Sequence, residues 1–165
     1  MKKVIAILVI GFLLFGCKSK LKPRELGAFE YKTAGVSMTN DRILVSSWGF
    51  GKTKKECEIS ALKKAVKDVV FKGILDGNPS CKQPPILTKV NAEKEYQSFF
   101  ETFLSDDGKY INYAEINGEP RSQSHSKKVR KLDRVLNMEL EFQILIDRNG
   151  LVKLLQQPNI TNNQE

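Results

Sequence analysis

The stretch from Ser46 to Thr53 has the residue types that could bind a phosphate group. It reads Ser-Ser-Trp-Gly-Phe-Gly-Lys-Thr and matches the nucleotide-binding pattern G-x-x-x-x-G-K-[ST] except at the first glycine. In such a loop Lys52 would contact the β- and γ-phosphates, while Thr53 and Asp147 would hold a magnesium ion. Ser46 replaces the glycine that turns this loop, and the chain is too short for the parallel sheet that carries it. We therefore favour Thr53 as the cap of a following helix and expect neither a cofactor nor a metal.

Few other residues have catalytic potential. His125 is the only histidine and lies in a polar stretch, so neither a histidine-based metal site nor a Ser-His-Asp triad with a well-supported base is indicated. Asp106 and Asp107 precede a glycine, a combination that favours a turn over a cation site. We expect a protein that is not an enzyme.

The N-terminus has the features of a secretory signal peptide. Lys2 and Lys3 provide a positive region, and an apolar run of twelve residues follows from Val4 to Phe15. A helix that spans a bilayer needs about 20 residues, so this run is too short to remain as a membrane anchor. The sequence predicts that residues 1–16 are removed.

The end of this run resembles the lipobox of bacterial lipoproteins. Leu14-Phe15-Gly16-Cys17 places a leucine three residues and a glycine one residue before a cysteine, although Phe15 is bulkier than the usual residue there. The resemblance implies a diacylglyceryl thioether on Cys17 and an acyl chain on its amine, with the lipid bilayer as a partner. Each buried CH₂ adds roughly 0.8 kcal/mol, so two or three chains anchor a protein firmly. The alternative is a plain secretory signal with a chance cysteine.

The residue after the cysteine indicates the destination. In the lipoprotein family an aspartate at this position favours the inner membrane, and Lys18 stands here instead. We therefore expect a lipid-anchored protein of the outer membrane whose domain faces the periplasm.

The chain is basic, with a formal net charge of +8. Behind a cleaved leader, such a charge favours anionic headgroups, polysaccharide or acidic proteins as partners. One local cluster comprises Lys127, Lys128, Arg130, Lys131 and Arg134. No aromatic residues are interleaved with it for base stacking, so we expect no nucleic-acid binding.

Composition divides the mature chain into three parts. Residues 17–40 are expected to hold the lipidated N-terminus and a polar tether, in which Pro23 excludes a continuous helix. Residues 41–157 are expected to form a single domain, and residues 158–165 a flexible tail.

Hydrophobic periodicity predicts the elements of this domain. They are a strand at 43–50, a helix of about 20 residues after Thr53, a long loop at 75–92, a helix from Asn91 to about Leu104, a strand at 110–116, a polar connection at 117–128, a strand at 136–147 and a helix at 149–156. This order, roughly β-α-α-β-β-α, indicates an α+β fold with helices packed on one face of an antiparallel sheet.

The helix after Thr53 has the clearest division into two faces. Apolar residues recur at three and four positions and predict a buried stripe: Cys57, Ala61, Leu62, Ala65, Val66, Val69, Val70 and Ile74. The opposite face, with Lys55, Lys63, Lys64, Lys67 and Asp68, is expected to face solvent. In the second helix an aromatic stripe of Tyr96, Phe99, Phe100 and Phe103 predicts core packing.

Cys57 and Cys81 are the cysteines that remain after lipidation. In an oxidising periplasm they could form a disulfide. The alternative is a buried Cys57 on the apolar stripe and a separate thiol in the loop.

The pattern Trp48-Gly49-Phe50-Gly51, with Ala61, Ala65 and the apolar run Val69–Ile74 behind it, resembles a group of small Gram-negative envelope lipoproteins. Their domain is similar to the N-terminal module of flagellar assembly protein T and to part of the curli secretion channel subunit. The resemblance covers residues 43–146 and implies an α+β domain at the cell envelope.

Two functions remain open from the sequence. The first is a non-enzymatic lipoprotein that binds another envelope protein, as an accessory of a secretion or assembly system. The second is a cell-envelope lipoprotein that binds a ligand or glycan, which the aromatic residues and the long loops at 75–92 and 117–128 favour.

Overall fold

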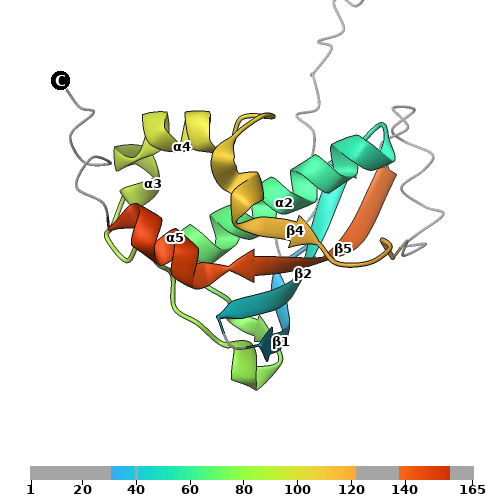
Figure 1. The fold of residues 1–165 in the computed structure, drawn as a ribbon, viewed down its shortest axis with the longest axis horizontal. Helices are drawn as coiled ribbons and strands as arrows, with labels where there is room; N and C mark the ends of the chain where they lie inside the picture. Colours follow the sequence, from blue (N-terminus) through green and yellow to red (C-terminus); the bar gives the residue numbers. More distant parts are fainter. Residues whose placement is uncertain (1–30, 40, 122–137, 157–165) are drawn as a thin grey trace, which may run out of the picture.

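The computed structural model describes residues 31–39, 41–121 and 138–156 (Figure 1). They form an α+β fold on a five-stranded sheet with the strand order β3-β1-β2-β5-β4, which confirms the predicted fold class. Neighbouring strands pair antiparallel except β1 and β3, which pair in parallel. Several predictions fall outside the described residues: the signal peptide at 1–16, Cys17, His125, the basic cluster at 127–134 and the tail at 158–165.

The described residues form the following strands and helices, given in chain order. They are β1 (Ala34–Thr39), β2 (Arg42–Gly51), α2 (Lys54–Phe71), β3 (Asp76–Gly77), the 3₁₀-helix η1 (Pro79–Cys81), α3 (Ala92–Glu95), α4 (Gln97–Phe103), the 3₁₀-helix η2 (Lys109–Asn112), β4 (Ala114–Ile116), β5 (Met138–Asp147) and α5 (Arg148–Leu155).

The central pair of the sheet is β2 with β5. Their ladder runs from Arg42 opposite Asp147 to Gly51 opposite Met138. Side chains alternate between the two faces of a strand, and one face of this pair is buried. Its large apolar members are Ile43, Val45, Leu140, Phe142, Ile144 and Ile146. On the other face Trp48 is half-buried and Phe50 is exposed.

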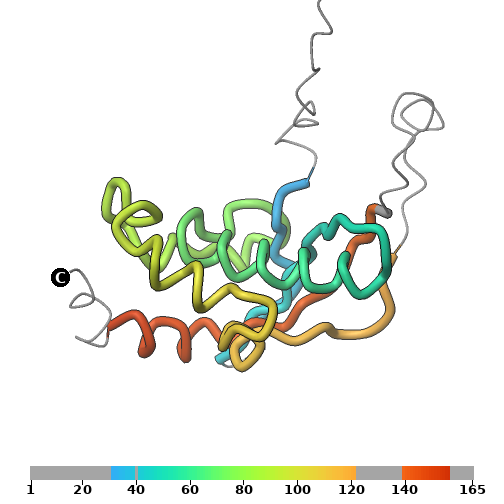
Figure 2. Tube along the Cα trace, turned by 90° about the horizontal axis from the view of Figure 1, so that it is seen from above, coloured from blue at the N-terminus to red at the C-terminus, as the bar shows by residue number. Residues whose placement is uncertain are grey.

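Helix α2 covers the buried face, and α4 lies beside it (Figure 2). The predicted apolar stripe is confirmed, because Cys57, Ala61, Ala65, Val66 and Val69 are all buried. The small residues on this stripe allow a close approach to the sheet. Phe71 near the end of α2 contacts Phe100 of α4, with ring centroids 4.8 Å apart, and this contact joins the two helices.

The first turn of α2 contains the predicted helix cap. Thr53 Oγ1 accepts a hydrogen bond from the Glu56 backbone N–H at 3.2 Å, and the Glu56 carboxylate accepts one from the Lys52 N–H at 2.7 Å. Thr53→Ala removes the acceptor, so we expect the free energy of unfolding to fall by about 1 kcal/mol. Thr53→Ser keeps the hydroxyl and serves as the control. Urea denaturation of both variants tests this, and equal stabilities for alanine and serine would contradict the capping role.

The predicted tether up to residue 40 is wrong at its end. Residues Ala34–Thr39 form β1, in which Thr39 pairs with Arg42 and Ala34 with Ser46. This strand provides hydrogen-bonding partners for one edge of β2. The folded domain therefore begins before residue 41.

The predicted helix from Asn91 to Leu104 is divided into α3 and α4 at Tyr96. Asn91, where the predicted helix begins, has a left-handed backbone with φ of 67° and makes no side-chain cap. Instead, its backbone carbonyl accepts hydrogen bonds from the next turn. Core packing of the aromatic stripe is confirmed for Phe100 and Phe103, while Tyr96 and Phe99 are half-buried.

Two other predicted segments have more local structure than the sequence indicated. Only Ala114–Ile116 of the predicted strand at 110–116 is a strand, because Tyr110 turns inward on η2 and is buried. The predicted loop at 75–92 contains β3, η1 and a bridge between Ile74 and Gln83.

Candidate functional site

The residues of the near phosphate-binding loop are not assembled into a nucleotide site. Thr53 caps α2, and Asp147 caps α5 by accepting a hydrogen bond from the Gly150 N–H at 2.7 Å. Asp147 pairs with Arg42 at one end of the ladder, whereas Lys52 follows Gly51 at the other end. Nine residue steps separate these ends, or about 30 Å of extended chain. Lys52 and Asp147 therefore cannot contact one phosphate group.

Cys57 and Cys81 form no disulfide with each other, so the structure has the separate cysteines that the sequence left open as the alternative. Cys57 lies against Gly49 at one end of β2, whereas Cys81 lies against Gly35, which pairs with Val45. Four residue steps of β2 separate these places by about 13 Å, and a disulfide needs Cα atoms within about 7 Å. The alternative of two separate buried thiols is the one that the structure supports.

The two thiols are expected to react only when the chain unfolds. Both side chains are fully buried, and burial raises the pKa of the Cys57 thiol, so little thiolate is present at pH 8. We expect neither Cys57 nor Cys81 to react with Ellman's reagent before denaturation, and dithiothreitol to leave the melting temperature unchanged. A melting temperature that falls on reduction would indicate a disulfide and contradict this expectation.

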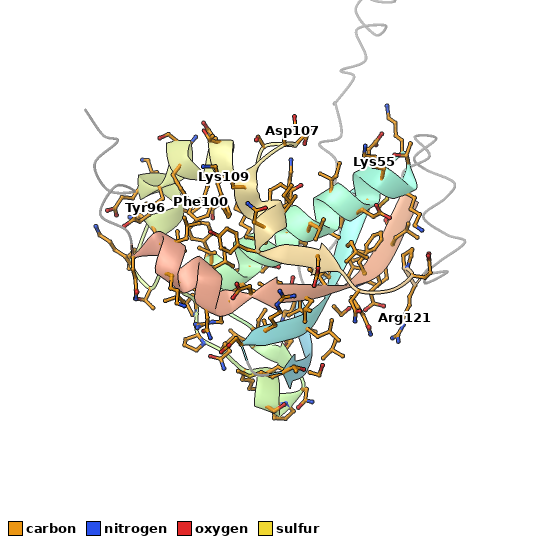
Figure 3. All side chains as sticks on the ribbon, viewed as in Figure 1. Lys55, Tyr96, Phe100, Asp107, Lys109 and Arg121 are labelled. Atoms are coloured by element: carbon orange, nitrogen blue, oxygen red, sulfur yellow. The ribbon has the colours of Figure 1, made fainter. Side chains whose placement is uncertain are left out.

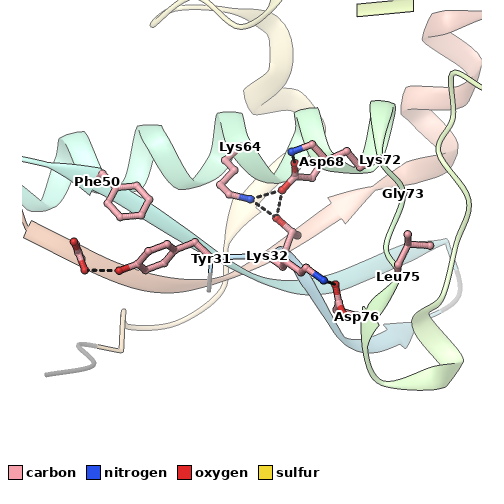
Figure 4. A pocket seen from close by; sticks show the side chains of 11 residues that line it. Tyr31, Lys32, Phe50, Lys64, Asp68, Lys72, Gly73, Leu75 and Asp76 are labelled. Carbon is pink, nitrogen blue, oxygen red and sulfur yellow. Dashed lines mark hydrogen bonds and ion pairs between the residues drawn. The ribbon is translucent and has the colours of Figure 1, made fainter. Parts of the chain in front are cut away.

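A hollow of about 580 Å³ lies beside the first described residues of the chain, between them and α2 (Figure 4). We call it the edge hollow. Its walls combine apolar and charged groups from β2, α2, β3, β5, the connection between α2 and β3, and the chain before β1. The lining residues are Tyr31, Lys32, Thr33, Phe50, Lys64, Asp68, Lys72, Gly73, Leu75, Asp76 and Glu139. Phe50 and Leu75 keep 38% and 64% of their surface exposed, so apolar area is open to a ligand here.

Asp68 is the centre of a polar network in the wall of the edge hollow. Its carboxylate accepts a hydrogen bond from Thr33 Oγ1 at 2.6 Å and forms ion pairs with Lys64 and Lys72. Thr33 Oγ1 also lies 3.3 Å from Ser47 Oγ on β2. The network therefore ties α2 to the chain before β1 and to β2.

The ionisation of Asp68 is set by these contacts. Burial leaves only 5% of the residue exposed and is the largest single influence, since it favours the neutral acid. Hydrogen bonds from Lys64, Thr33 and Lys72, with the charge of Lys64, outweigh it and lower the pKa of Asp68. The carboxylate is thus ionised at neutral pH, and its negative charge is shared by two lysines.

Aromatic rings and a carboxylate form one end of the edge hollow, and an ion pair lies at the other end. At the β5 end the Tyr31 hydroxyl donates to Glu139 at 3.0 Å, and the Tyr31 ring lies edge-on to Trp48 and Phe50 with centroids 5.3 and 5.0 Å away. At the β3 end Lys32 pairs with Asp76 at 3.2 Å.

The remaining candidate residues have structural roles. Asp106 accepts a hydrogen bond from Lys63, which lowers the pKa of Asp106, and this contact ties the turn after α4 to α2.

Across the described parts of the chain, no three histidine, cysteine, aspartate or glutamate residues gather as a metal site would need. No helix in the same parts has the length and apolar character to cross a bilayer.

A second hollow of about 820 Å³ lies between α2 and the α3 and α4 helices. Phe71, Leu87 and Phe100 contribute apolar surface to it, while Lys67 and Lys89 contribute charge. Phe100 lies apart from Lys55 at the start of α2, with Tyr96 still farther away (Figure 3). This hollow is thus separate from the region that resembles a phosphate-binding loop.

Known proteins provide no further guide to the site. The chain matches no family model, and neither curated proteins nor solved structures give a match. Its function must be argued from its own residues.

Sequence reasoning missed most of the edge hollow. Tyr31, Lys32 and Thr33 fall in the predicted tether, and Lys64 and Asp68 fall on the helix face predicted to be solvated. One signal was present, because Asn40 and Asp41 stand between two runs that can form strands, as in a hairpin turn. That signal would have predicted β1 and placed the residues before it beside α2.

Proposed function

We propose that this chain is a non-enzymatic, lipid-anchored protein of the outer membrane that binds another envelope protein as an accessory of a secretion or assembly system. The lipobox at Leu14–Cys17 supports the anchor and the location. The edge hollow supports the binding role and is the observation that carries it, since it leaves aromatic and aliphatic surface open within a folded domain.

The roles of the polar residues support binding over catalysis. Thr53 and Asp147 cap helices instead of holding a magnesium ion. Asp68 of the edge hollow is ion-paired to Lys64 and Lys72. A catalytic carboxylate or lysine commonly has a pKa shifted toward neutrality. The lowered pKa of Asp68 moves in the opposite direction.

The position of the edge hollow also fits a partner near the membrane. Tyr31 follows Cys17 by fourteen residues. Even a fully extended chain of that length spans at most about 50 Å. A lipid on Cys17 would therefore keep the hollow within reach of envelope proteins that emerge from the same membrane.

Photo-crosslinking in the cells that produce the protein tests this proposal. A photoreactive amino acid replaces Leu75 in the edge hollow, and a matched variant carries it at Val90, which is 82% exposed and lies outside the hollow. We expect one envelope protein, identified by mass spectrometry, to be captured from Leu75 and not from Val90. Cys17→Ala is expected to release the chain from the outer-membrane fraction and to abolish the capture. Equal capture from both positions, or membrane association without Cys17, would overturn the proposal.

A ligand or glycan binder is the second candidate function, and the hollow between α2, α3 and α4 favours it. This hollow is bordered by Leu87, Lys89 and Asn91 of the segment that the sequence predicted as a long loop. NMR titration with envelope glycan fragments distinguishes the two. Shifts centred on Leu87 and Asn91 support a glycan binder, and their absence removes this candidate.

A further inference from the structure

The two ends of the edge hollow carry net charges of opposite sign. Lys64 and Lys72 share the single carboxylate of Asp68, which leaves one positive charge in excess on the α2 side. Glu139 at the other end accepts a hydrogen bond from Tyr31 and forms no ion pair with any residue that the structure describes. Since a carboxylate can accept several hydrogen bonds, Glu139 retains capacity for a cationic group.

The distance between these charges can be read from α2. The Phe50 N–H donates to Ser60 Oγ at 3.3 Å, so the Phe50 and Glu139 end lies level with Ser60. Lys72 follows Ser60 by twelve residues, or about 18 Å along the helix axis. An extended chain covers that distance in between five and six residue steps of about 3.3 Å.

An exposed apolar side chain lies at each charged end of the edge hollow. The described residues include five large apolar side chains that are exposed, and two of them, Phe50 and Leu75, line this hollow. Figure 4 shows Phe50 and Tyr31 toward one end of α2 and Lys72 and Leu75 toward the other. Each end thus combines a charged group with an apolar side chain: Glu139 with Phe50, and Lys72 with Leu75.

We infer that the edge hollow binds an extended segment of about seven residues from a partner protein, with a basic side chain at Glu139, apolar side chains over Phe50 and Leu75, and an acidic side chain at Lys72. The inference rests on the proposed function, because it names the chemistry of the partner at the same hollow. The opposite net charges of the two ends and the distance between them carry the inference. Side chains at alternate positions of an extended segment point to one face, so the basic, apolar and acidic groups can all meet the hollow.

The test uses the full chain in detergent and a labelled probe peptide with blocked ends, Lys-Ala-Leu-Ala-Leu-Ala-Glu. Fluorescence anisotropy is expected to show binding that Glu139→Lys or Lys72→Glu each weakens about fivefold, since attraction becomes repulsion at one end. The double variant is expected to restore the affinity, because the peptide can bind in the reverse direction. A second probe peptide has lysine at both ends. Lys72→Glu alone is expected to bind this second peptide more tightly than the unaltered chain does. This gain distinguishes lost complementarity from lost folding.

Four results would overturn the inference, and the first three concern the probe. The first is no binding at about 1 mM probe, and the second is an affinity that does not change with the charges of the peptide. The third is displacement of the probe by phosphatidylethanolamine vesicles, which would assign the hollow to a lipid headgroup. A tighter affinity after Lys127, Lys128, Arg130, Lys131 and Arg134 are changed to glutamine would do the same, by assigning the hollow to the chain's own basic residues. If the peptides fail while Leu75 still captures an envelope protein, the proposed function stands without this inference; if both fail, both are wrong.

Discussion

A methyl group at position 49 is expected to lower the free energy of unfolding by about 3 kcal/mol. A Cβ at Gly49 would lie 1.8 Å from the carbonyl oxygen of Cys57 and 2.7 Å from its carbonyl carbon. These are backbone atoms in the first turns of α2, so no side-chain rotation can relieve the clash. Gly49→Ala therefore forces α2 away from β2, the strand over which its apolar stripe packs. Urea denaturation of the full chain measures the change.

Gly118→Ala is the matched control for this prediction. Gly118 has a φ of 83°, and no heavy atom lies within 4 Å of its added Cβ. The control therefore introduces backbone strain of about 1–2 kcal/mol without a clash. If Gly49→Ala costs no more than Gly118→Ala, the helix does not approach the sheet as closely as the structure has it.

The central elements could be predicted because their burial is periodic. β5 alternates apolar and polar residues along its length, and α2 carries its apolar stripe between a threonine cap and Gly73, which has a φ of 73°. Both patterns follow directly from the geometry of strands and helices. The fold class follows from these two elements and β2.

Elements with weak periodicity could not be predicted. β1 has the sequence Ala-Gly-Val-Ser-Met-Thr, in which small and polar residues dominate, because Gly35 must leave room for Cys81. The break at Tyr96 has no proline or glycine to signal it. Phe100 of α4 contacts Phe71 of α2, and the local sequence around Tyr96 does not signal this tertiary contact.

The edge hollow was hidden for a related reason. Its residues come from segments that are far apart in the sequence, and no local pattern joins Tyr31 to Glu139 or Thr33 to Asp68. Asp68 follows Lys64 by four residues on a lysine-rich face, a spacing typical of a solvated helix pair. The chain before β1 covers this pair and makes the carboxylate buried.

Asp68→Asn is expected to lower the free energy of unfolding by about 3 kcal/mol at pH 7. The amide cannot balance Lys64 and Lys72, so two lysines remain beside a buried group without their counter-ion. Asp106→Asn provides the control, because Asp106 pairs with Lys63 at an exposed site, where an ion pair contributes little.

The loss of stability in Asp68→Asn is expected to depend on pH, because it arises from the charge of the carboxylate. The pKa of Asp68 is lowered in the folded chain, so its stabilising contribution is complete above the pKa of the unfolded state, about 3.9. The contribution is lost as the pH falls through the lower folded-state pKa, because protonation then removes the charge that Asn already lacks. Urea denaturation at pH 7 and near pH 3 is therefore expected to show that the unaltered chain and Asp68→Asn differ less in free energy of unfolding at the lower pH. A gap that is equal at both pH values would mean that hydrogen bonding to Thr33, and not the charge shared with the two lysines, holds α2 to the chain before β1.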